Sequence, residues 1–203
     1  MKKIEELEKY AEENHVPIIR PKTLEYLLSH VEKYKPKNIL EIGTAIGYSG
    51  IKMLLQSATD TVLTTIELNE KSYDIAKQNF DSFGFDDRVD CICGDAKVVL
   101  PRLVDDGKKF DMIFLDGPKG QYINYLPFIK KLLSPDGSIF ADNVLFRGMV
   151  QSTEFIPHRN RTIVVNLRKY LDEVNKAPFT STLYDIEDGF CISVSNNLKH
   201  KKR

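Results

Sequence analysis

The sequence has little of what several classes of protein require. Its 203 residues include three cysteines (Cys91, Cys93 and Cys191), too few and too unevenly spaced for a disulfide scaffold, which favours a reducing compartment. The 29 basic and 29 acidic residues balance, so the chain is not a polycation that coats nucleic acid, although this balance still permits a local basic patch. No stretch approaches the roughly 18 consecutive apolar residues of a membrane-spanning helix.

The beginning of the sequence also lacks the pattern of a targeting segment. MKKIEELEKYAEE is charged throughout, whereas a signal peptide has an apolar centre, so we expect a soluble, cytoplasmic protein with no membrane partner. A composition of 42% hydrophobic and 29% charged residues excludes disorder as the main state, and the length favours one domain. We divide it into an N-terminal helical cap (1–36), a core (37–195) and a basic tail (196–203).

Short apolar runs alternate with longer amphipathic runs along most of the chain, which is typical of an α/β fold. The predicted strands are 38–42, 62–67, 89–93, 110–115, 138–142, 181–184 and 190–195. The predicted helices are 2–14, 23–35, 49–55, 70–83, 96–103, 122–133 and 162–175. The prolines of HVPIIRPK predict an extended segment between the first two helices. Strands rich in Ile, Val, Leu and Phe indicate parallel pairing with helices on both faces, and the short turn DIEDG predicts an antiparallel pair at the end.

The ends of five consecutive predicted strands each carry an acidic residue. These residues are Glu41, Glu67, Asp95, Asp116 and Asp142. In open parallel sheets, ligands bind beyond the carboxyl ends of the strands, so the set indicates a polar binding site. Acids in these places also form turns and cap helices, which stays an alternative for any single member.

The first of these strand ends leads into LEIGTAIGYSG, where Gly43 and Gly47 allow a tight turn and close approach of a ligand. The segment lacks the lysine of a phosphate-binding loop and the G-x-G-x-x-G of a dinucleotide site. Glu41 disfavours phosphate and favours a cation, Glu67 suits a ribose diol, and Asp95 suits an adenine amino group. A nucleoside without phosphates and with a cationic tail is S-adenosylmethionine.

The combination of E-x-G-x-x-x-G, a second-strand acid and G-D-A resembles the class I S-adenosylmethionine-dependent methyltransferases over about residues 40–194. The resemblance implies a Rossmann-like fold with a seven-stranded, mostly parallel sheet and an antiparallel last strand. The cofactor-binding residues that it implies are Glu41, Gly43, Tyr48, Ser49, Glu67, Gly94, Asp95, Ala96 and Asp116. For Tyr48, burial in the core is an equal alternative, and we expect Cys91 and Cys93 to be core residues.

A second group of oxygen donors, Asp116, Asp142 and Asn143, follows the fourth and fifth predicted strands. If these strands are neighbours, the donors converge and suit Mg²⁺ or Mn²⁺, whereas the alternative is that Asp142 and Asn143 only turn the chain. Lys119 comes three residues after Asp116. A cation beside a lysine disfavours its ammonium form, which makes Lys119 a candidate general base toward a hydroxyl.

The pattern D-G-P-K-x-x-Y with a later D-N resembles the metal-dependent, catechol O-methyltransferase-like branch of these enzymes. That resemblance implies that Asp116, Asp142 and Asn143 hold the metal, while Lys119 deprotonates a hydroxyl of the acceptor. It also implies an acceptor with two adjacent oxygens, which one metal ion orients.

Three further segments, HVPIIRP, LFRGMV and HRNRTIVVNLRKYL, are similar to the bacterial tRNA 5-hydroxyuridine methyltransferases. This resemblance implies methylation of the 5-hydroxyl of a wobble uridine to 5-methoxyuridine, in a cytoplasmic homodimer that binds the tRNA anticodon loop. The 5-hydroxyl and the neighbouring O4 form the adjacent oxygen pair.

Basic residues after the predicted metal ligands give modest support for an RNA partner. Residues 147–176 contain six basic and three acidic side chains. The residues that we expect to contact RNA are Arg20, Arg147, Arg159 and Arg161, whereas we expect Arg168 and Lys169 to lie on a solvated helix face. Two alternatives remain: a small-molecule methyltransferase acting on catechols or phenols at the same site, and a noncatalytic binding module.

Overall fold

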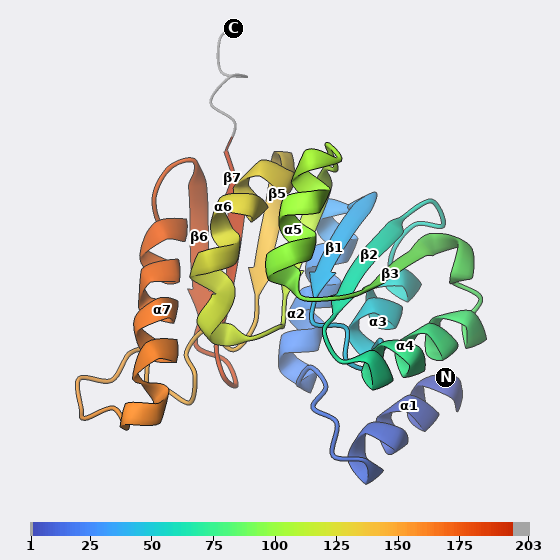
Figure 1. The fold of residues 1–203 in the computed structure, drawn as a ribbon, viewed down its shortest axis with the longest axis horizontal. Helices are drawn as coiled ribbons and strands as arrows, with labels where there is room; N and C mark the ends of the chain where they lie inside the picture. Colours follow the sequence, from blue (N-terminus) through green and yellow to red (C-terminus); the bar gives the residue numbers. More distant parts are fainter. Residues whose placement is uncertain (1, 197–203) are drawn as a thin grey trace, which may run out of the picture. The chain divides into compact units, whose positions relative to one another are not determined.

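The computed structural model describes residues 2–196, which leaves all but one residue of the expected basic tail outside the described part. The chain divides into two compact units, residues 1–99 and 100–203 (Figure 1). Seven strands form one sheet in the order β3-β2-β1-β4-β5-β7-β6. The predicted Rossmann-like fold, with a mostly parallel sheet and an antiparallel end, is confirmed.

The first unit alternates helices with parallel strands. Its elements are α1 (Lys2–Glu13), α2 (Pro21–Tyr34), β1 (Asn38–Ile42), α3 (Tyr48–Gln56), β2 (Val62–Glu67), α4 (Glu70–Ser82), a 3-10 turn (Asp86–Arg88) and β3 (Val89–Cys93). β2 pairs with β1 on one side and β3 on the other, both parallel. The extended segment that we predicted ends two residues sooner than HVPIIRPK implies, because Pro21 starts α2, where its missing N–H costs nothing.

The second unit carries the antiparallel end of the sheet. Its elements are α5 (Ala96–Asp105, which begins in the first unit), β4 (Phe110–Leu115), a 3-10 turn (Lys119–Gln121), α6 (Tyr122–Leu132), β5 (Leu133–Ala141), α7 (His158–Val174), β6 (Phe179–Tyr184) and β7 (Phe190–Ser195). β4 and β5 are parallel, and β7 pairs antiparallel with both β5 and β6. α7 begins four residues before the predicted start, directly after Pro157.

Burial follows the position of each strand in the sheet. Ile39 and Leu40 on adjacent positions of β1 are both buried, as expected of a parallel strand covered on both faces. β3 ends the strand order, and our expectation that its cysteines belong to the core is wrong: Cys91 is half-buried and Cys93 is exposed.

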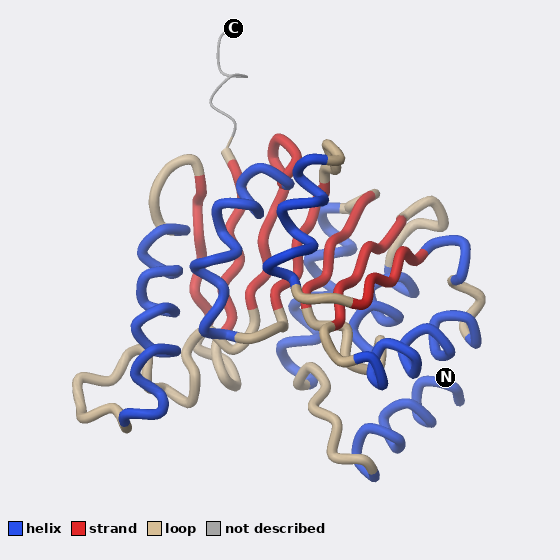
Figure 2. Tube along the Cα trace, viewed as in Figure 1, coloured by secondary structure: helices blue, strands red, loops and turns tan. Residues whose placement is uncertain are grey.

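Figure 2 shows the helices around the strands. No helix among the described residues is long and apolar enough to cross a membrane.

One histidine is buried within the packing of α2. His30 is only 5% exposed, and its ring centroid lies 4.3 Å from that of Tyr34. Burial, together with the positive charge of Lys33, lowers the pKa of His30 to about 4 from its ordinary value of 6.5. The folded chain therefore holds this imidazole in its neutral form.

This burial predicts a pH dependence of stability. Between pH 6.5 and 4 the unfolded chain takes up a proton at His30 that the folded chain does not, so the free energy of unfolding falls as pH is lowered through that window. The whole effect is at most about 3 kcal/mol. Urea denaturation of the wild type and of His30→Gln at several pH values should show a shallower fall in the variant. The exposed His158→Gln is the control, and an equal pH dependence in wild type and His30→Gln would contradict the prediction.

Candidate active site

The first unit shapes a loop of residues 43–47, here called the glycine loop, between β1 and α3. Its two glycines have positive φ angles, +104° at Gly43 and +83° at Gly47. A side chain at Gly47 would approach the ring of Phe80 to 3.1 Å, so both backbone conformation and space require glycine there. The Ala45 N–H donates to Glu67 Oε2 at 2.8 Å, which ties the loop to the end of β2.

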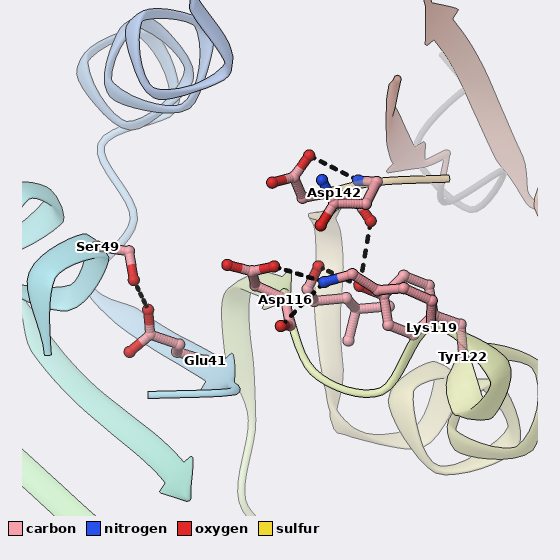
Figure 3. A network of polar contacts seen from close by, with 8 residues as sticks. Glu41, Ser49, Asp116, Lys119, Tyr122 and Asp142 are labelled. Carbon is pink, nitrogen blue, oxygen red and sulfur yellow. Dashed lines mark hydrogen bonds and ion pairs between the residues drawn. The ribbon is translucent and has the colours of Figure 1, made fainter. Parts of the chain in front are cut away.

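The buried carboxylate of Glu41 is connected to this loop by hydrogen bonds. Glu41 is 0% exposed, and it accepts a hydrogen bond from Ser49 Oγ at 2.5 Å (Figure 3). It accepts another from Thr65 Oγ1 at 2.7 Å. The Thr65 hydroxyl also lies 2.6 Å from that of Thr44, inside the loop. The structure thus gives Glu41 a positioning role, and a direct contact between its charge and a ligand stays a prediction.

The next two acids bind nearby backbone N–H groups, and their role in binding the cofactor stays a prediction. Glu67 Oε1 accepts from the Asn69 N–H and Oε2 from the Ala45 N–H, each at 2.8 Å, so every oxygen keeps a further lone pair for a ribose diol. Asp95 Oδ1 accepts from the Lys97 N–H at 2.9 Å and so caps the start of α5. The Gly94 N–H donates to the Glu67 carbonyl at 2.8 Å, which joins the two strand ends.

Two other predicted cofactor residues are buried. Tyr48, at the start of α3, donates its hydroxyl proton to Glu8 at 2.6 Å, and burial raises its pKa. Ala96 is buried in the first turn of α5. The burial of Tyr48 therefore agrees with the alternative that it is a core residue.

The second unit brings two acids together by strand register. In the parallel pairing of β4 with β5, Leu115 is opposite Ala141, so Asp116 and Asp142 follow paired positions. β4 and β5 are therefore neighbours, which is the condition under which we predicted that these oxygen donors converge. We call Asp116 and Asp142 the acid pair.

Tyr122 locks the ends of these two strands together. Its hydroxyl lies 2.9 Å from the Leu115 carbonyl and 3.1 Å from the Asp142 carbonyl and shares its proton between them (Figure 3). The residue is fully buried, and burial raises its pKa, so it remains a donor. We gave Tyr122 no role from the sequence, although its place in D-G-P-K-x-x-Y was a signal.

Lys119 lies beside the acid pair. The 3-10 turn that follows β4 places its Nζ 2.7 Å from Asp116 Oδ1 and 3.1 Å from the Asp116 carbonyl. Asp142 is only 3% exposed, and burial, with a smaller contribution from Asp116, raises its pKa to about 7. Lys119 and the Asn143 N–H, which donates to Asp142 Oδ1 at 2.6 Å, oppose that rise.

The donors fit a hard divalent cation. Asp116 and Asp142 are close enough to raise each other's electrostatic energy, and a cation held by them and by the Asn143 amide would offset that repulsion. The set holds two carboxylates and an amide, and no group of three or more His, Cys, Asp or Glu residues suited to a metal occurs in the described part of the chain. A metal at Asp116, Asp142 and Asn143 therefore stays a prediction that the chemistry of these residues supports.

The loop after β5 is held by the turn between β6 and β7, a contact that we did not predict from the sequence. Asn143, Phe146 and Arg147 have positive φ angles of 54°, 46° and 58°. The β6–β7 turn supports this strained backbone, because the Arg147 N–H donates to the Asp188 carboxylate and the Val144 N–H donates to the Gly189 carbonyl. From the sequence, DIEDG indicated only a tight connection.

The arginines expected to contact RNA are exposed. Arg147, Arg159 and Arg161 are exposed side chains of the second unit, and Arg20 is an exposed residue of the first, directly before α2. The expectation of a solvated Arg168 is wrong. Its guanidinium is half-buried and donates to backbone carbonyls of the loop before α7, at Met149, Val150 and Ser152.

Comparison with known proteins assigns these residues to a family. Residues 2–194 match the family model described as O-methyltransferase. The chain belongs to the O-methyltransferase family. The match includes the glycine loop, the acid pair and Lys119, so all of the features described above belong to the part shared with other O-methyltransferases.

Three relatives illustrate the similarity. A catechol O-methyltransferase from Niastella koreensis is 36% identical over 133 residues, covering 65% of this chain and 60% of that protein, so the chain spans about three fifths of that relative's length. A Staphylococcus aureus structure to which caffeoyl-CoA O-methyltransferase activity has been ascribed is 35% identical, with a TM-score of 0.85 over 95% of this chain and 92% of that one. The Bacillus cereus O-methyltransferase in complex with SAH is 27% identical, with a TM-score of 0.87 over 97% and 91% of the two chains.

Gly189 offers a test of how this O-methyltransferase holds the loop after β5. Its φ angle is +72°, and a Cβ there would lie 2.2 Å from Leu145 Cγ, whereas Gly84 has the same φ of +72° with nothing within 4 Å. Gly84→Ala should lower the free energy of unfolding by about 1–2 kcal/mol through backbone strain alone. Gly189→Ala should cost about 1–3 kcal/mol more, because Leu145 must move. Urea denaturation measures both, and equal losses would contradict the packing described here.

Proposed function

We propose that this chain is an S-adenosylmethionine- and metal-dependent O-methyltransferase that methylates the 5-hydroxyl of 5-hydroxyuridine at the tRNA wobble position. The observation that carries the proposal is the contact of Lys119 Nζ with Asp116 of the acid pair at 2.7 Å, followed along the chain by exposed Arg147, Arg159 and Arg161. The first feature suits removal of a proton from a hydroxyl, and the second suits a phosphate backbone.

The cofactor would bind to the first unit. Glu67 has lone pairs left for a ribose diol, Asp95 lies at the next strand end for the adenine, and the positive φ angles of Gly43 and Gly47 let the glycine loop turn tightly between them. The absence of a phosphate-binding lysine from that loop agrees with a nucleoside cofactor. The SAH bound by the Bacillus cereus relative supports the same choice.

The acceptor would bind to the second unit, where Asp116, Asp142 and Asn143 would hold Mg²⁺ or Mn²⁺. The ion would lower the pKa of the acceptor hydroxyl and orient the adjacent oxygen. Lys119 would accept the hydroxyl proton as the general base. Bound S-adenosylmethionine would supply the methyl group to the acceptor oxygen, and the carbon–sulfur bond that breaks would leave S-adenosylhomocysteine. Tyr122 keeps the ends of β4 and β5 aligned during this step.

A small phenol is the second candidate acceptor, and the relatives named for catechol and caffeoyl-CoA favour it. A phenol site would be expected to place apolar side chains directly after Asn143 to stack on the ring. Val144 and Leu145 occupy those positions, but both are buried, with exposures of 0% and 2%. Arg147, Arg159 and Arg161 are among the exposed side chains that follow, and this concentration of positive charge is why we prefer RNA.

The proposal includes a cytoplasmic homodimer, as the resemblance to the tRNA-modifying family implies. Light scattering coupled to gel filtration measures the mass of the assembly directly. A mass of 46.6 kDa, twice the 23.3 kDa of one chain, is the expected result, and a mass of one chain would remove the dimer from the proposal.

Lys119 should be required for chemistry and not for cofactor binding. Lys119→Ala is expected to lower kcat by about 10²–10⁴-fold, the usual contribution of a general base, while the Kd for S-adenosylmethionine is nearly unchanged. Lys119→Arg preserves a positive partner for Asp116 but cannot accept the proton, so it should not restore turnover. Single-turnover rates and cofactor titration measure the two effects, with the exposed Lys108→Ala as the control. Full activity in Lys119→Arg would show that Lys119 acts as a charge and not as a base.

The acceptor can be identified by label transfer. Purified protein, labelled S-adenosylmethionine and Mg²⁺ are combined with tRNA that carries 5-hydroxyuridine, with the same tRNA lacking it, or with catechol. We expect label only in the hydroxylated tRNA, and we expect its loss on chelation because the acid pair then lacks its cation. Label in catechol alone would favour the second candidate, and no label in any acceptor, with retained RNA binding, would favour a binding module.

A further inference from the structure

One aromatic side chain stands out on the surface of the second unit. Phe155 is 79% exposed, the largest exposed fraction among the large apolar side chains that are exposed in residues 2–196. It lies in the segment between β5 and α7, which Figure 2 shows as a loop that projects from the second unit. Exposure of a whole ring costs free energy in water, so its surroundings merit an explanation.

A fixed guanidinium covers one face of this ring. The central carbon of the Arg161 guanidinium lies 5.2 Å from the Phe155 ring centroid. Arg161 Nε also donates to the Ile156 carbonyl at 3.1 Å, which holds the guanidinium beside the ring. The cation–π contact orients the ring, while its exposure leaves most of the surface open to a ligand.

The loop that carries Phe155 is tied to α7 at several points. Arg168 donates to the Val150 carbonyl at 2.9 Å and to the Ser152 carbonyl at 2.7 Å. The Glu154 N–H donates to Ser152 Oγ at 3.0 Å, which shapes the turn directly before the ring. A ring held in advance loses less conformational entropy when a ligand stacks on it.

The charge around the ring points to the kind of ligand. Arg147, Arg159 and Arg161 are exposed, and Glu154 is the one acidic residue in 147–161. Phe155 is also the one large apolar side chain exposed within that range, which is too little apolar surface for a stable protein interface. An exposed aromatic ring beside one arginine, in a segment that carries two more, suits the binding of unpaired bases, which stack on the ring while cations hold the phosphates.

We propose that Phe155 and Arg161 form a stacking site for an unpaired base of the RNA acceptor. This inference rests on the proposed tRNA function and adds to it a residue that would select single-stranded RNA over a small phenol. The base stacks on the open face of the Phe155 ring, and Arg159 contributes charge to the neighbouring phosphate.

The test is the binding of a fluorescent anticodon stem-loop RNA, followed by anisotropy at several salt concentrations. Phe155→Ala should weaken binding by about tenfold with no change in salt dependence, because stacking releases no counterions. Phe155→Tyr should bind like the wild type, because it keeps a ring. Arg159→Gln should instead reduce the slope of log K against log salt by about one. Phe155 is exposed, so unchanged melting temperatures are expected in all three variants.

Each alternative result separates this inference from the proposed function. If the wild type methylates hydroxylated tRNA but Phe155→Ala binds RNA as tightly, the stacking site is wrong and the function stands. If Phe155→Ala raises the KM for catechol as much as for RNA, the ring contacts the reacting group and the stacking site is again wrong. If the wild type neither binds nor methylates RNA but methylates catechol, the proposed function itself fails.

Discussion

The parallel pairing of β4 with β5 is the constraint on which the proposed acceptor site of this chain depends. Because Leu115 is opposite Ala141, the next residue of each strand is an aspartate, and the two carboxylates meet in a largely buried place. Such a pair is unfavourable without opposite charge. Lys119 forms an ion pair with Asp116, and the Asn143 N–H donates to the Asp142 carboxylate. The Tyr122 hydroxyl donates to the backbone carbonyl of Asp142. In the chemistry that we propose, a divalent cation would offset the repulsion between these two carboxylates.

The two units hold their loops by different means. In the first, neutral hydroxyls bind the buried Glu41 and two backbone N–H groups bind Glu67, so the glycine loop is shaped by hydrogen bonds. In the second, the backbone after Asp142 is strained, and it is held by the turn that contains Asp188 and Gly189. A strained, well-supported segment is common where side chains must be placed accurately. The support comes from residues about 45 positions further along the chain.

Patterns that depend on local spacing were predicted well from the sequence. The apolar runs of β1 and β4 and the acid after each parallel strand could be assigned because strand ends in such sheets share one edge. Features that depend on contacts between residues far apart in the sequence could not be predicted. Arg168 has the spacing of a solvated helix residue, and only the folded loop reveals the carbonyls that it binds. Cys93 has core character in the sequence, but its exposure follows from the place of β3 at the end of the strand order.

The central claim is that the acid pair binds a divalent cation, and Mn²⁺ titration followed by electron paramagnetic resonance tests it without relying on activity. The account predicts one bound Mn²⁺ per chain in the wild type. Binding should be lost in Asp142→Asn, which removes a charge with little change of shape, and retained in the control Asp106→Asn, which makes the same change at an exposed residue. Absence of binding in the wild type, or equal binding in wild type and Asp142→Asn, would contradict the account.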